Sequence, residues 1–329
     1  WKCIDLPART SLITTTYHHE RGPTFLSRAC RPTLLPMSPS LPHPSAAASG
    51  ASSRGTSPQR ALVIGGAGRM GAWLAGYLRQ RGLTVEIADP AGVPAGFQHY
   101  ADWRETALDH DLIAVAAPLR TSAAILEEIR ERKPPGIVFD VGSLKSPLRA
   151  GLTRLAEAGI ATTSIHPMFG PSVEELTGRH IIVIDVGHPD ATAHVARLFD
   201  GTGARLVPMA LDQHDRMVAY VLGLSHALNI AFVTALADCG ESAAELIRLS
   251  STTFDRQLAV ASPVVDENPH LYFEIQRLND FGLDALDALQ DAVQRVRTAV
   301  QDGDEATFVQ LMERGREYLQ ERKPADRSD

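Results

Sequence analysis

The sequence predicts an α/β protein, with a doubly wound parallel sheet in its first half and an all-helical domain after it. Three observations lead to this prediction. Short apolar segments of strand length alternate with segments of helical periodicity between residues 59 and 208. A glycine-rich turn follows the first of these apolar segments, and from Leu211 onward the apolar residues recur at helical spacing.

Composition is that of an ordinary soluble protein. The chain has 329 residues, of which 44% are hydrophobic and 22% charged, so it can bury a sizeable core and form two domains. Its net charge of −7 gives no general attraction to nucleic acid or to anionic membranes, and an anionic substrate must be gathered by local cations. Cys3, Cys30 and Cys239 form neither a CxxC pair nor an even-numbered framework, and we expect no metal site.

Residues 1–58 differ from the rest. They are rich in Pro, Ser, Thr and Ala, nearly free of acidic residues and without hydrophobic periodicity, so we expect a disordered leader. Position 1 is Trp, and Met37 opens a Ser/Pro/Ala-rich run. We therefore favour a leader that is not native upstream of Met37 over an organelle transit peptide, and we expect a cytoplasmic protein.

The glycine-rich turn has the spacing GxGxxG. Ala61–Ile64 has the composition of a strand, Gly66-Ala67-Gly68-Arg69-Met70-Gly71 follows it, and residues 72–81 have helical periodicity. In such a unit the glycines let the backbone approach a pyrophosphate, whose charge the helix N-terminus stabilises. The pattern predicts a Rossmann-type dinucleotide-binding domain at residues 59–208, with the cofactor bound by Gly66, Gly68, Arg69, Met70 and Gly71.

An acidic residue, Asp89, ends the second predicted strand at residues 84–88. It lies eighteen residues after Gly71, where an acid typically receives the ribose hydroxyls. Its carboxylate would repel the 2′-phosphate of NADP, and Pro90-Ala91-Gly92 supplies no compensating cation, so we expect NAD rather than NADP. The alternative is that Asp89 only begins the turn before Pro90.

The alternation continues along the chain. Further strands are expected at 111–118, 136–141, 164–167, 181–184 and 205–208, with a helix at 122–132. Repeated units of this length predict a parallel, doubly wound sheet. Ligands of such sheets bind beyond the carboxyl ends of the strands, so we expect Pro118, at one of these ends, to contact the cofactor.

Two other strand ends carry chemically useful side chains. Ser143 and Lys145 follow the strand at 136–141, and His166 stands in the short strand at 164–167. Hydride transfer from an alcohol needs a group that takes the hydroxyl proton, and a neutral histidine is suited to this role. His166 is the candidate base, against the alternative that it only bonds the backbone beside Pro167. From spacing alone, Ser143 could equally cap a helix and Lys145 could be a solvated surface charge.

The chain resembles the prephenate dehydrogenase family over about residues 60–322. The resemblance rests on the glycine motif, Asp140-Val141-Gly142-Ser143-Leu144-Lys145, His166-Pro167-Met168-Phe169-Gly170-Pro171 and Asp212-Gln213-His214-Asp215. It implies NAD-dependent oxidative decarboxylation of prephenate to 4-hydroxyphenylpyruvate on the route to tyrosine. It also implies two catalytic residues: His166 would accept the hydrogen bond of the substrate C4 hydroxyl and assist its deprotonation, and Ser143 would position that hydroxyl.

The second domain is expected at residues 209–325. Residues 217–237 contain no Asp, Glu, Lys or Arg and meet the length of a membrane span, but polar residues interrupt them. We favour a helix buried in a core or a subunit interface, and no membrane partner. Two later helices are expected to pack through apolar stripes, formed by Leu286, Leu289, Val293, Val296 and Val300 and by Phe308, Leu311, Met312, Tyr318 and Leu319. The family resemblance implies that this domain forms a homodimer.

The implied substrate is a dicarboxylate, which the planar fork of an arginine binds well. The family usually places an arginine six residues before a proline that matches Pro269, but that position is Pro263 here. Arg256, two helical turns before Pro263, and Arg277 are the nearest substitutes, and each could instead be an ordinary surface charge.

A histidine of the apolar helix adds to the expected substrate site. His226 matches a histidine that the family commonly has near the substrate, and we assign it to substrate binding together with Arg256 and Lys145. His214 is expected to brace the start of its helix.

Other activities stay open. The missing arginine makes 4-amino-4-deoxyprephenate, which would give 4-aminophenylpyruvate in antibiotic biosynthesis, a serious alternative, and arogenate is another. A β-hydroxyacid dehydrogenase would need a lysine on the helical domain, and none occurs between Lys145 and Lys323. A non-catalytic dinucleotide-sensing module is the alternative outside enzymes.

Overall fold

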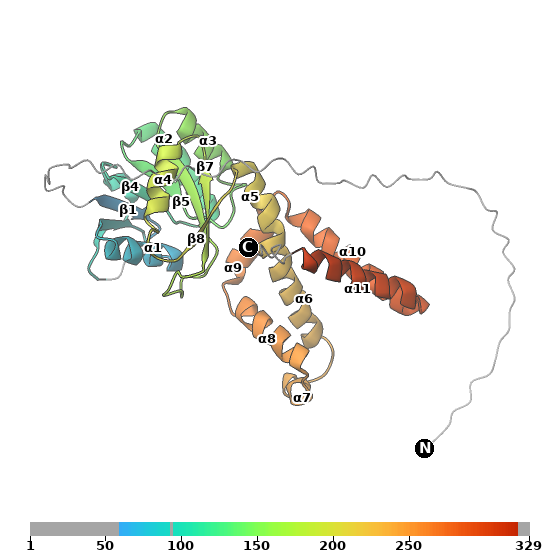
Figure 1. Ribbon diagram of the computed structural model, residues 1–329. Helices are drawn as coiled ribbons and strands as arrows, with labels where there is room; N and C mark the ends of the chain where they lie inside the picture. The colour runs from blue at the N-terminus through green and yellow to red at the C-terminus, as the bar shows by residue number, and fades with distance from the viewer. Residues whose placement is uncertain (1–58, 93–94, 322–329) are drawn as a thin grey trace, which may run out of the picture. The chain divides into compact units, whose positions relative to one another are not determined.

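The computed structural model describes residues 59–92 and 95–321, so the expected leader, with Met37, lies outside the described residues. An eight-stranded sheet has the strand order β3-β2-β1-β4-β5-β6-β7-β8. Helices cover both of its faces, and a group of helices follows it in the chain (Figure 1). The strands are β1 (Arg60–Ile64), β2 (Thr84–Ala88), β3 (Gln98–Tyr100), β4 (Leu112–Val115), β5 (Ile137–Asp140), β6 (Thr162–Pro167), β7 (His180–Asp185) and β8 (Arg205–Pro208).

The strand order reverses at β1, which pairs in parallel with β2 on one side and with β4 on the other. The pairs β4–β5 and β5–β6 are also parallel. The carboxyl ends of β1, β4, β5 and β6 therefore lie at one edge of the sheet, where doubly wound sheets bind their ligands at the switch in strand order. The predicted α/β fold is confirmed.

Strand β7 departs from the expected parallel sheet, because it runs antiparallel to β6. Parallel neighbours need a crossover of a dozen or more residues, usually a helix. Residues 168–179, between β6 and β7, contain no helix, and the chain returns antiparallel. Helix α4 (Pro189–Arg197) then provides the crossover that makes β8 parallel to β7. The three-residue edge strand β3 had no signal in the sequence pattern.

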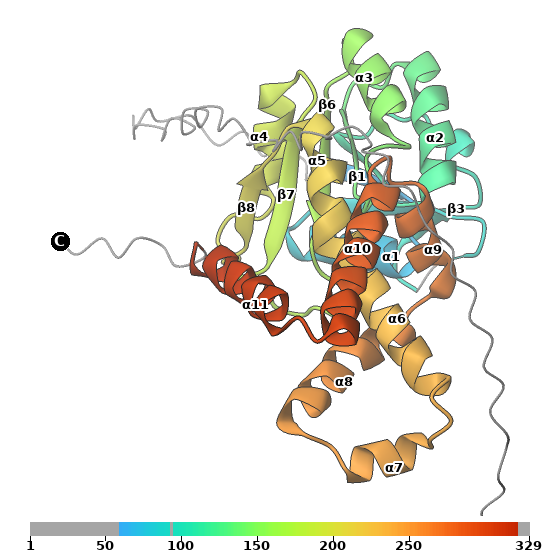
Figure 2. The ribbon, with the colours of Figure 1, turned by 90° about the vertical axis from the view of Figure 1, so that its right-hand side faces the viewer.

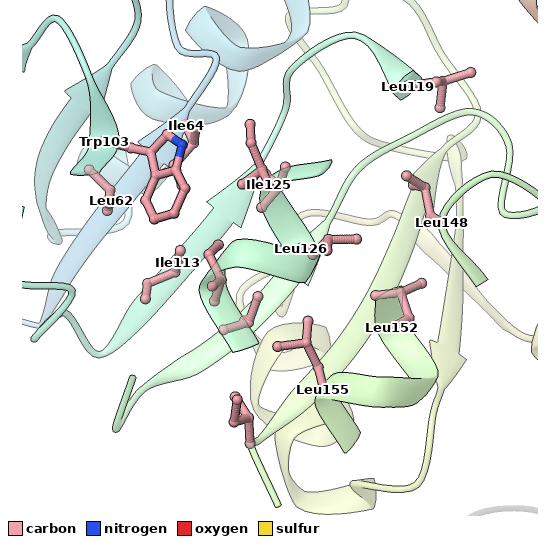
Figure 3. Close-up of a cluster of buried hydrophobic side chains, with 14 of the residues drawn as sticks. Leu62, Ile64, Trp103, Ile113, Leu119, Ile125, Leu126, Leu148, Leu152 and Leu155 are labelled. Atoms are coloured by element: carbon pink, nitrogen blue, oxygen red, sulfur yellow. The ribbon is translucent and has the colours of Figure 1, made fainter. Parts of the chain in front are cut away.

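Alternate residues of the central strands feed two separate cores, because successive side chains of a strand point to opposite faces. On one face, Leu62, Ile64 and Ile113 pack with Ile125 and Leu126 of α2 (Leu119–Arg132) and Leu152 and Leu155 of α3 (Arg149–Glu157), as Figure 3 shows. On the other, Ala61, Val63 and Phe139 pack with Leu74 and Leu78 of α1 (Arg69–Gln80) and Val195 of α4. Burial on both faces holds the strand ends in fixed positions.

The residues after β8 are helical as far as the structure describes them. A continuous helix of 27 residues, Leu211–Ala237, is long and apolar enough by length and composition to cross a membrane. It consists of α5 (Leu211–Val218), a π-helical segment (Ala219–Leu224) and α6 (Ser225–Ala237), and is followed by α7 (Ala243–Arg248), α8 (Thr252–Val265), α9 (Pro269–Arg277), α10 (Gly282–Asp302) and α11 (Glu305–Gln320) (Figure 2).

The apolar stripes of α10 and α11, through which these helices were expected to pack, are largely uncovered within one chain. Leu286, Leu289 and Leu311 are half-buried, but the other members are exposed: Val293, Val296, Val300, Phe308, Met312, Tyr318 and Leu319. The physical reason is that the distal part of α10 and most of α11 pack mainly on each other (Figure 1). Apolar periodicity identifies a packing face but not which chain covers it.

One buried cation holds the carboxyl edge of the sheet together. The Lys145 side chain is fully buried, and its ammonium donates hydrogen bonds to Asp140 Oδ2 at 2.6 Å, the Gly142 carbonyl at 2.8 Å and the Ile165 carbonyl at 2.9 Å. It thus joins the end of β5 to β6. Burial lowers the pKa of Lys145, and the charge of Asp140 opposes that shift. Such a cation is tolerated inside a protein only with partners of this kind.

We predict that Lys145→Met lowers the free energy of unfolding by about 3–5 kcal/mol, because it leaves the buried Asp140 carboxylate without its cation. Chemical denaturation followed by circular dichroism measures the change. Lys133→Met is the matched control, since Lys133 is exposed at the end of α2 and its loss should cost no more than about 0.5 kcal/mol. Equal stability of the two variants would contradict the role given to Lys145.

Candidate active site

The glycine turn before α1, called the glycine cradle below, is packed too closely for side chains at its glycines. Gly65 has φ +88°, and a Cβ there would stand 2.6 Å from the Ala117 nitrogen. A Cβ on Gly66 would strike the Ile87 side chain, and one on Gly71 would strike the Gly65 carbonyl. These glycines are required by close packing of β1, α1 and the neighbouring strand ends.

Helix α1 begins at Arg69, three residues earlier than the sequence pattern indicated. The last part of the glycine motif is therefore the first turn of the helix. Gly68, its N-cap, brings no side chain to cap the free amides, and the first turn contains no acidic residue. A helix N-terminus with these properties suits a phosphate group.

Asp89 connects the end of β2 to this turn. Its Oδ2 accepts a hydrogen bond from the Ala67 amide at 3.0 Å, and its Oδ1 accepts one from the Ala91 amide at 2.9 Å. Asp89 thus begins the turn after β2, as the alternative interpretation had it, and also lies against the glycine motif. Pro118 is exposed at the N-terminus of α2, beyond the end of β4 and at the same edge of the sheet.

Arg69 joins the glycine turn to the helical part of the chain. Its guanidinium lies 2.6 Å from Glu267 Oε2, in the segment between α8 and α9. The hydrogen bond from Arg69 lowers the pKa of Glu267. Arg69 itself is 63% exposed, so the pair contributes little to stability, but it shows that this segment of the helical domain lies next to the glycine turn.

His166 lies near the end of β6 and is only 3% exposed. Its Nδ1 is 3.0 Å from His214 Nε2, on α5. His214 Nδ1 in turn lies 2.5 Å from Asp215 Oδ1. Three side chains therefore form a buried row that begins on the sheet and ends on the helical domain.

The carboxylate at the end of this row is firmly held. Asp215 Oδ1 accepts a hydrogen bond from the Lys145 amide at 2.8 Å, and Oδ2 accepts one from the Ser146 amide. Asn279 Nδ2 donates to the Asp215 carbonyl at 2.9 Å. Burial acts to raise the pKa of Asp215, but the hydrogen bonds from His214, Ser146 and Lys145 outweigh it and lower the pKa to about 2.

The two histidines are held in the opposite electrostatic state. Burial, followed by the charges of His214 and Lys145, puts the pKa of His166 well below its usual range. Burial also lowers the pKa of His214, although the Asp215 carboxylate opposes that shift. At neutral pH the row therefore consists of two neutral rings and one ionised carboxylate.

Lys145 does not have the geometry of a substrate ligand. Each of its ammonium hydrogens has a protein acceptor, and its side chain is fully buried. The expectation that it binds substrate therefore does not fit, because no donor remains to point into a cleft. Ser143, two residues earlier, is half-buried on the loop that Lys145 anchors.

The expected substrate residues of the helical domain are spread over several helices. His226 on α6 stacks on Tyr272 of α9 with ring centroids 4.2 Å apart, and its buried Nδ1 has no partner among the described residues. Burial lowers the pKa of His226. Arg256 on α8 and Arg277 on α9 are both exposed side chains.

Sequence reasoning underestimated some of these residues. His214 was expected only to brace a helix, and Asp215 and Glu267 were given no role. The adjacency of His214 and Asp215 at the start of a helical domain was a possible signal. Their approach to His166 required the tertiary structure, because 48 residues separate the two rings.

Comparison with known proteins shows the family to which the chain belongs. The family model of the prephenate dehydrogenase nucleotide-binding domain matches residues 75–208. The family model of the prephenate dehydrogenase dimerization domain matches residues 211–314. The 4-amino-4-deoxyprephenate dehydrogenase of Streptomyces pristinaespiralis is 30% identical over 263 residues, which are 77% of this chain and 88% of that protein.

Two less similar proteins also match the chain. The probable arogenate/prephenate dehydrogenase of Methanocaldococcus jannaschii is 22% identical over 78% of this chain, which spans 60% of that protein's length. A crystal structure of prephenate dehydrogenase from A. aeolicus, in complex with hydroxyphenyl propionate and NAD+, has the same fold, with a TM-score of 0.64, 18% identity and coverage of 81% of this chain and 99% of that one. The chain belongs to the prephenate dehydrogenase family, whose members are NAD-dependent oxidoreductases.

Proposed function

We propose that this chain catalyses the NAD-dependent oxidative decarboxylation of prephenate to 4-hydroxyphenylpyruvate, as in tyrosine biosynthesis. The observation that carries the proposal is the buried, neutral His166 at the same sheet edge as the glycine cradle. In the reaction, the C4 hydroxyl proton passes to His166 as the C4 hydrogen leaves with its electron pair. The bond to the ring carboxylate then breaks, carbon dioxide departs and the ring becomes aromatic.

The cofactor site we propose is the cradle at α1. Bound NAD would supply the hydride acceptor. Gly66, Gly68 and Gly71, with the amides of Arg69 and Met70, would hold its pyrophosphate, because the N-terminus of α1 has no side-chain cap and no acidic residue in its first turn. Asp89 would receive the ribose hydroxyls, and its negative charge favours NAD over NADP. Pro118 would border the site beyond β4.

Substrate contacts come from both parts of the chain in this proposal. Ser143 would position the C4 hydroxyl toward His166, from the loop that Lys145 anchors. His226 would line the helical side of the site from α6, where it stacks on Tyr272. Arg256 is the cation of α8 that would meet a carboxylate.

A second substrate is favoured by a specific departure. The position where the family usually carries its arginine is Pro263, inside α8, and a proline offers no charge to a carboxylate. The relative from Streptomyces pristinaespiralis is named 4-amino-4-deoxyprephenate dehydrogenase and is 30% identical. Oxidation of that amine-bearing analogue to 4-aminophenylpyruvate is therefore the second candidate, ahead of arogenate. A dinucleotide-sensing module without catalysis is the third.

We propose that the helical domain joins two copies of the chain. The apolar stripes of α10 and α11 are exposed in a single chain, and contiguous exposed apolar patches often mark interaction surfaces. The match of residues 211–314 to a dimerization domain supports a second copy, rather than a membrane, as the cover of these helices and of the long apolar helix Leu211–Ala237. A cytoplasmic location fits a small-molecule substrate of this kind.

We predict that His166→Asn lowers kcat by about 10²–10⁴-fold, because the amide cannot take the proton. The affinity for NAD, measured by fluorescence titration, should change less than twofold, since His166 is outside the glycine cradle. His180→Asn, at an exposed histidine of β7, is the control and should keep full activity. A sensing module would give no NAD reduction even in the wild-type protein, whereas an unchanged kcat in His166→Asn would remove His166 as the base.

Steady-state kinetics should rank prephenate above its analogues in kcat/KM. The rate of NAD reduction is measured with prephenate, 4-amino-4-deoxyprephenate and arogenate, each pure and at equal ionic strength. We expect prephenate to lead. An advantage of about tenfold or more for the amino compound, which corresponds to about 1.4 kcal/mol in transition-state binding, would reverse the order of the two candidate functions.

The pH dependence of kcat should reflect the lowered pKa of His166. A base must be neutral to accept a proton, and the folded protein keeps the ring neutral below its ordinary pKa of 6.5. We therefore expect kcat to stay level as the pH falls through 6.5 and to decline only at lower pH. A decline with its midpoint at 6.5 would indicate a solvated ring and contradict the buried geometry.

A further inference from the structure

We infer that Asp215 and His214 together determine which nitrogen of His166 carries its proton, so that Nε2 is left as the acceptor for the substrate. The inference rests on the proposed function, because it assumes that His166 is the base. Asp215 and His214 are then positioning residues, which act on the reaction only through His166.

The carboxylate sets the direction of the first hydrogen bond. Asp215 is ionised and can only accept, so the contact of 2.5 Å to His214 Nδ1 requires a hydrogen on that nitrogen. A neutral imidazole carries one ring hydrogen. The other nitrogen of neutral His214, Nε2, is therefore a lone-pair acceptor.

This acceptor sets the direction of the second hydrogen bond. His214 Nε2 lies 3.0 Å from His166 Nδ1, so His166 must donate from Nδ1. Neutral His166 then has its lone pair on Nε2. That is the state a general base needs, since the opposite tautomer would present a hydrogen to the substrate hydroxyl instead of accepting one.

The same row accommodates the charge that the reaction creates. When the substrate O–H bond breaks and an Nε2–H bond forms, His166 becomes a buried imidazolium. Its Nδ1–H still donates to His214, whose Nδ1–H still donates to the Asp215 carboxylate. The positive charge is thus connected to a negative one through two hydrogen bonds inside a medium of low dielectric, where such a connection is strongest.

The row is held at both ends by one loop. The Lys145 ammonium binds the carbonyl of Ile165, the residue before His166, and the Lys145 amide binds Asp215 Oδ1. The Ser146 amide binds the other carboxylate oxygen. Displacement of this loop would therefore move the base and its orienting carboxylate together, which keeps their separation fixed.

The first test is the tautomer of His166 in the wild-type full-length protein. ¹⁵N-histidine NMR at neutral pH distinguishes a protonated from an unprotonated ring nitrogen, and His166→Asn assigns the signals. We expect Nδ1 protonated and Nε2 unprotonated. The opposite pattern would overturn the inference. This result needs no variant of His214 or Asp215 and does not depend on the activity of the enzyme.

The second test uses variants of the row. His214→Phe keeps a ring but removes the acceptor, and we expect His166 to populate the other tautomer and kcat to fall about 10–100-fold, with KM and NAD affinity within about twofold. His214→Gln can place its amide oxygen as an acceptor, and we expect it to recover part of the loss. Asp215→Asn should behave like His214→Phe. A neutral amide no longer requires His214 to carry its hydrogen on Nδ1, so the first hydrogen bond loses its fixed direction.

The outcomes separate this inference from the proposed function. If His166→Asn abolishes turnover while His214→Phe keeps both the tautomer and kcat, the inference fails and the base assignment stands. If His166→Asn stays active, the base assignment fails and with it the inference. Combining His214→Phe with His166→Asn should lower kcat no further than His166→Asn alone, since the row acts through one ring. A further loss of tenfold or more would mean that His214 acts independently.

Discussion

The buried ammonium of Lys145 is the contact on which the carboxyl edge of the sheet depends. An uncompensated charge in this position would cost several kcal/mol, so the ammonium needs hydrogen-bond acceptors from the segments that surround it. Here they are the Asp140 carboxylate and the carbonyls of Gly142 and Ile165. Satisfying one cation therefore fixes the end of β5, the loop after it and the strand that carries His166.

The same loop then extends this order to the helical domain. Its backbone amides at Lys145 and Ser146 hold the Asp215 carboxylate, and Asn279 holds the Asp215 carbonyl from the segment between α9 and α10. Contrasting environments follow from this arrangement. Asp215 accepts enough hydrogen bonds to remain ionised in spite of its burial. For His166 and His214, burial is the largest effect on the pKa, and both rings stay neutral. A single buried region thus supports one charged and two neutral groups.

The sequence was sufficient for features that depend on local pattern. The glycine turn, most of the strands and the position of His166 at a strand end all follow from short-range composition and periodicity. Features decided by partners far along the chain were not predictable in this way. The residues around Lys145 look the same in sequence whether its side chain is solvated or buried. The direction of β7 depends on the absence of a helix at residues 168–179. The α10 stripe likewise indicates a contact without naming the chain that makes it.

Helix α8 differs in charge from what the family pattern implies, and this bears on recognition of the proposed substrate. Helix α8 carries one cation, Arg256, two turns before Pro263, and the next charged residues along the chain are Asp266 and Glu267. Glu267 engages Arg69, so the guanidinium nearest the cradle is already paired with a carboxylate. A substrate site with one cation fewer attracts a dicarboxylate less strongly. Such a site also disfavours an amine substituent less, since an arginine at that position would repel the amine. In the proposed function, the charge on α8 and α9 therefore bears directly on the choice between prephenate and its amino analogue.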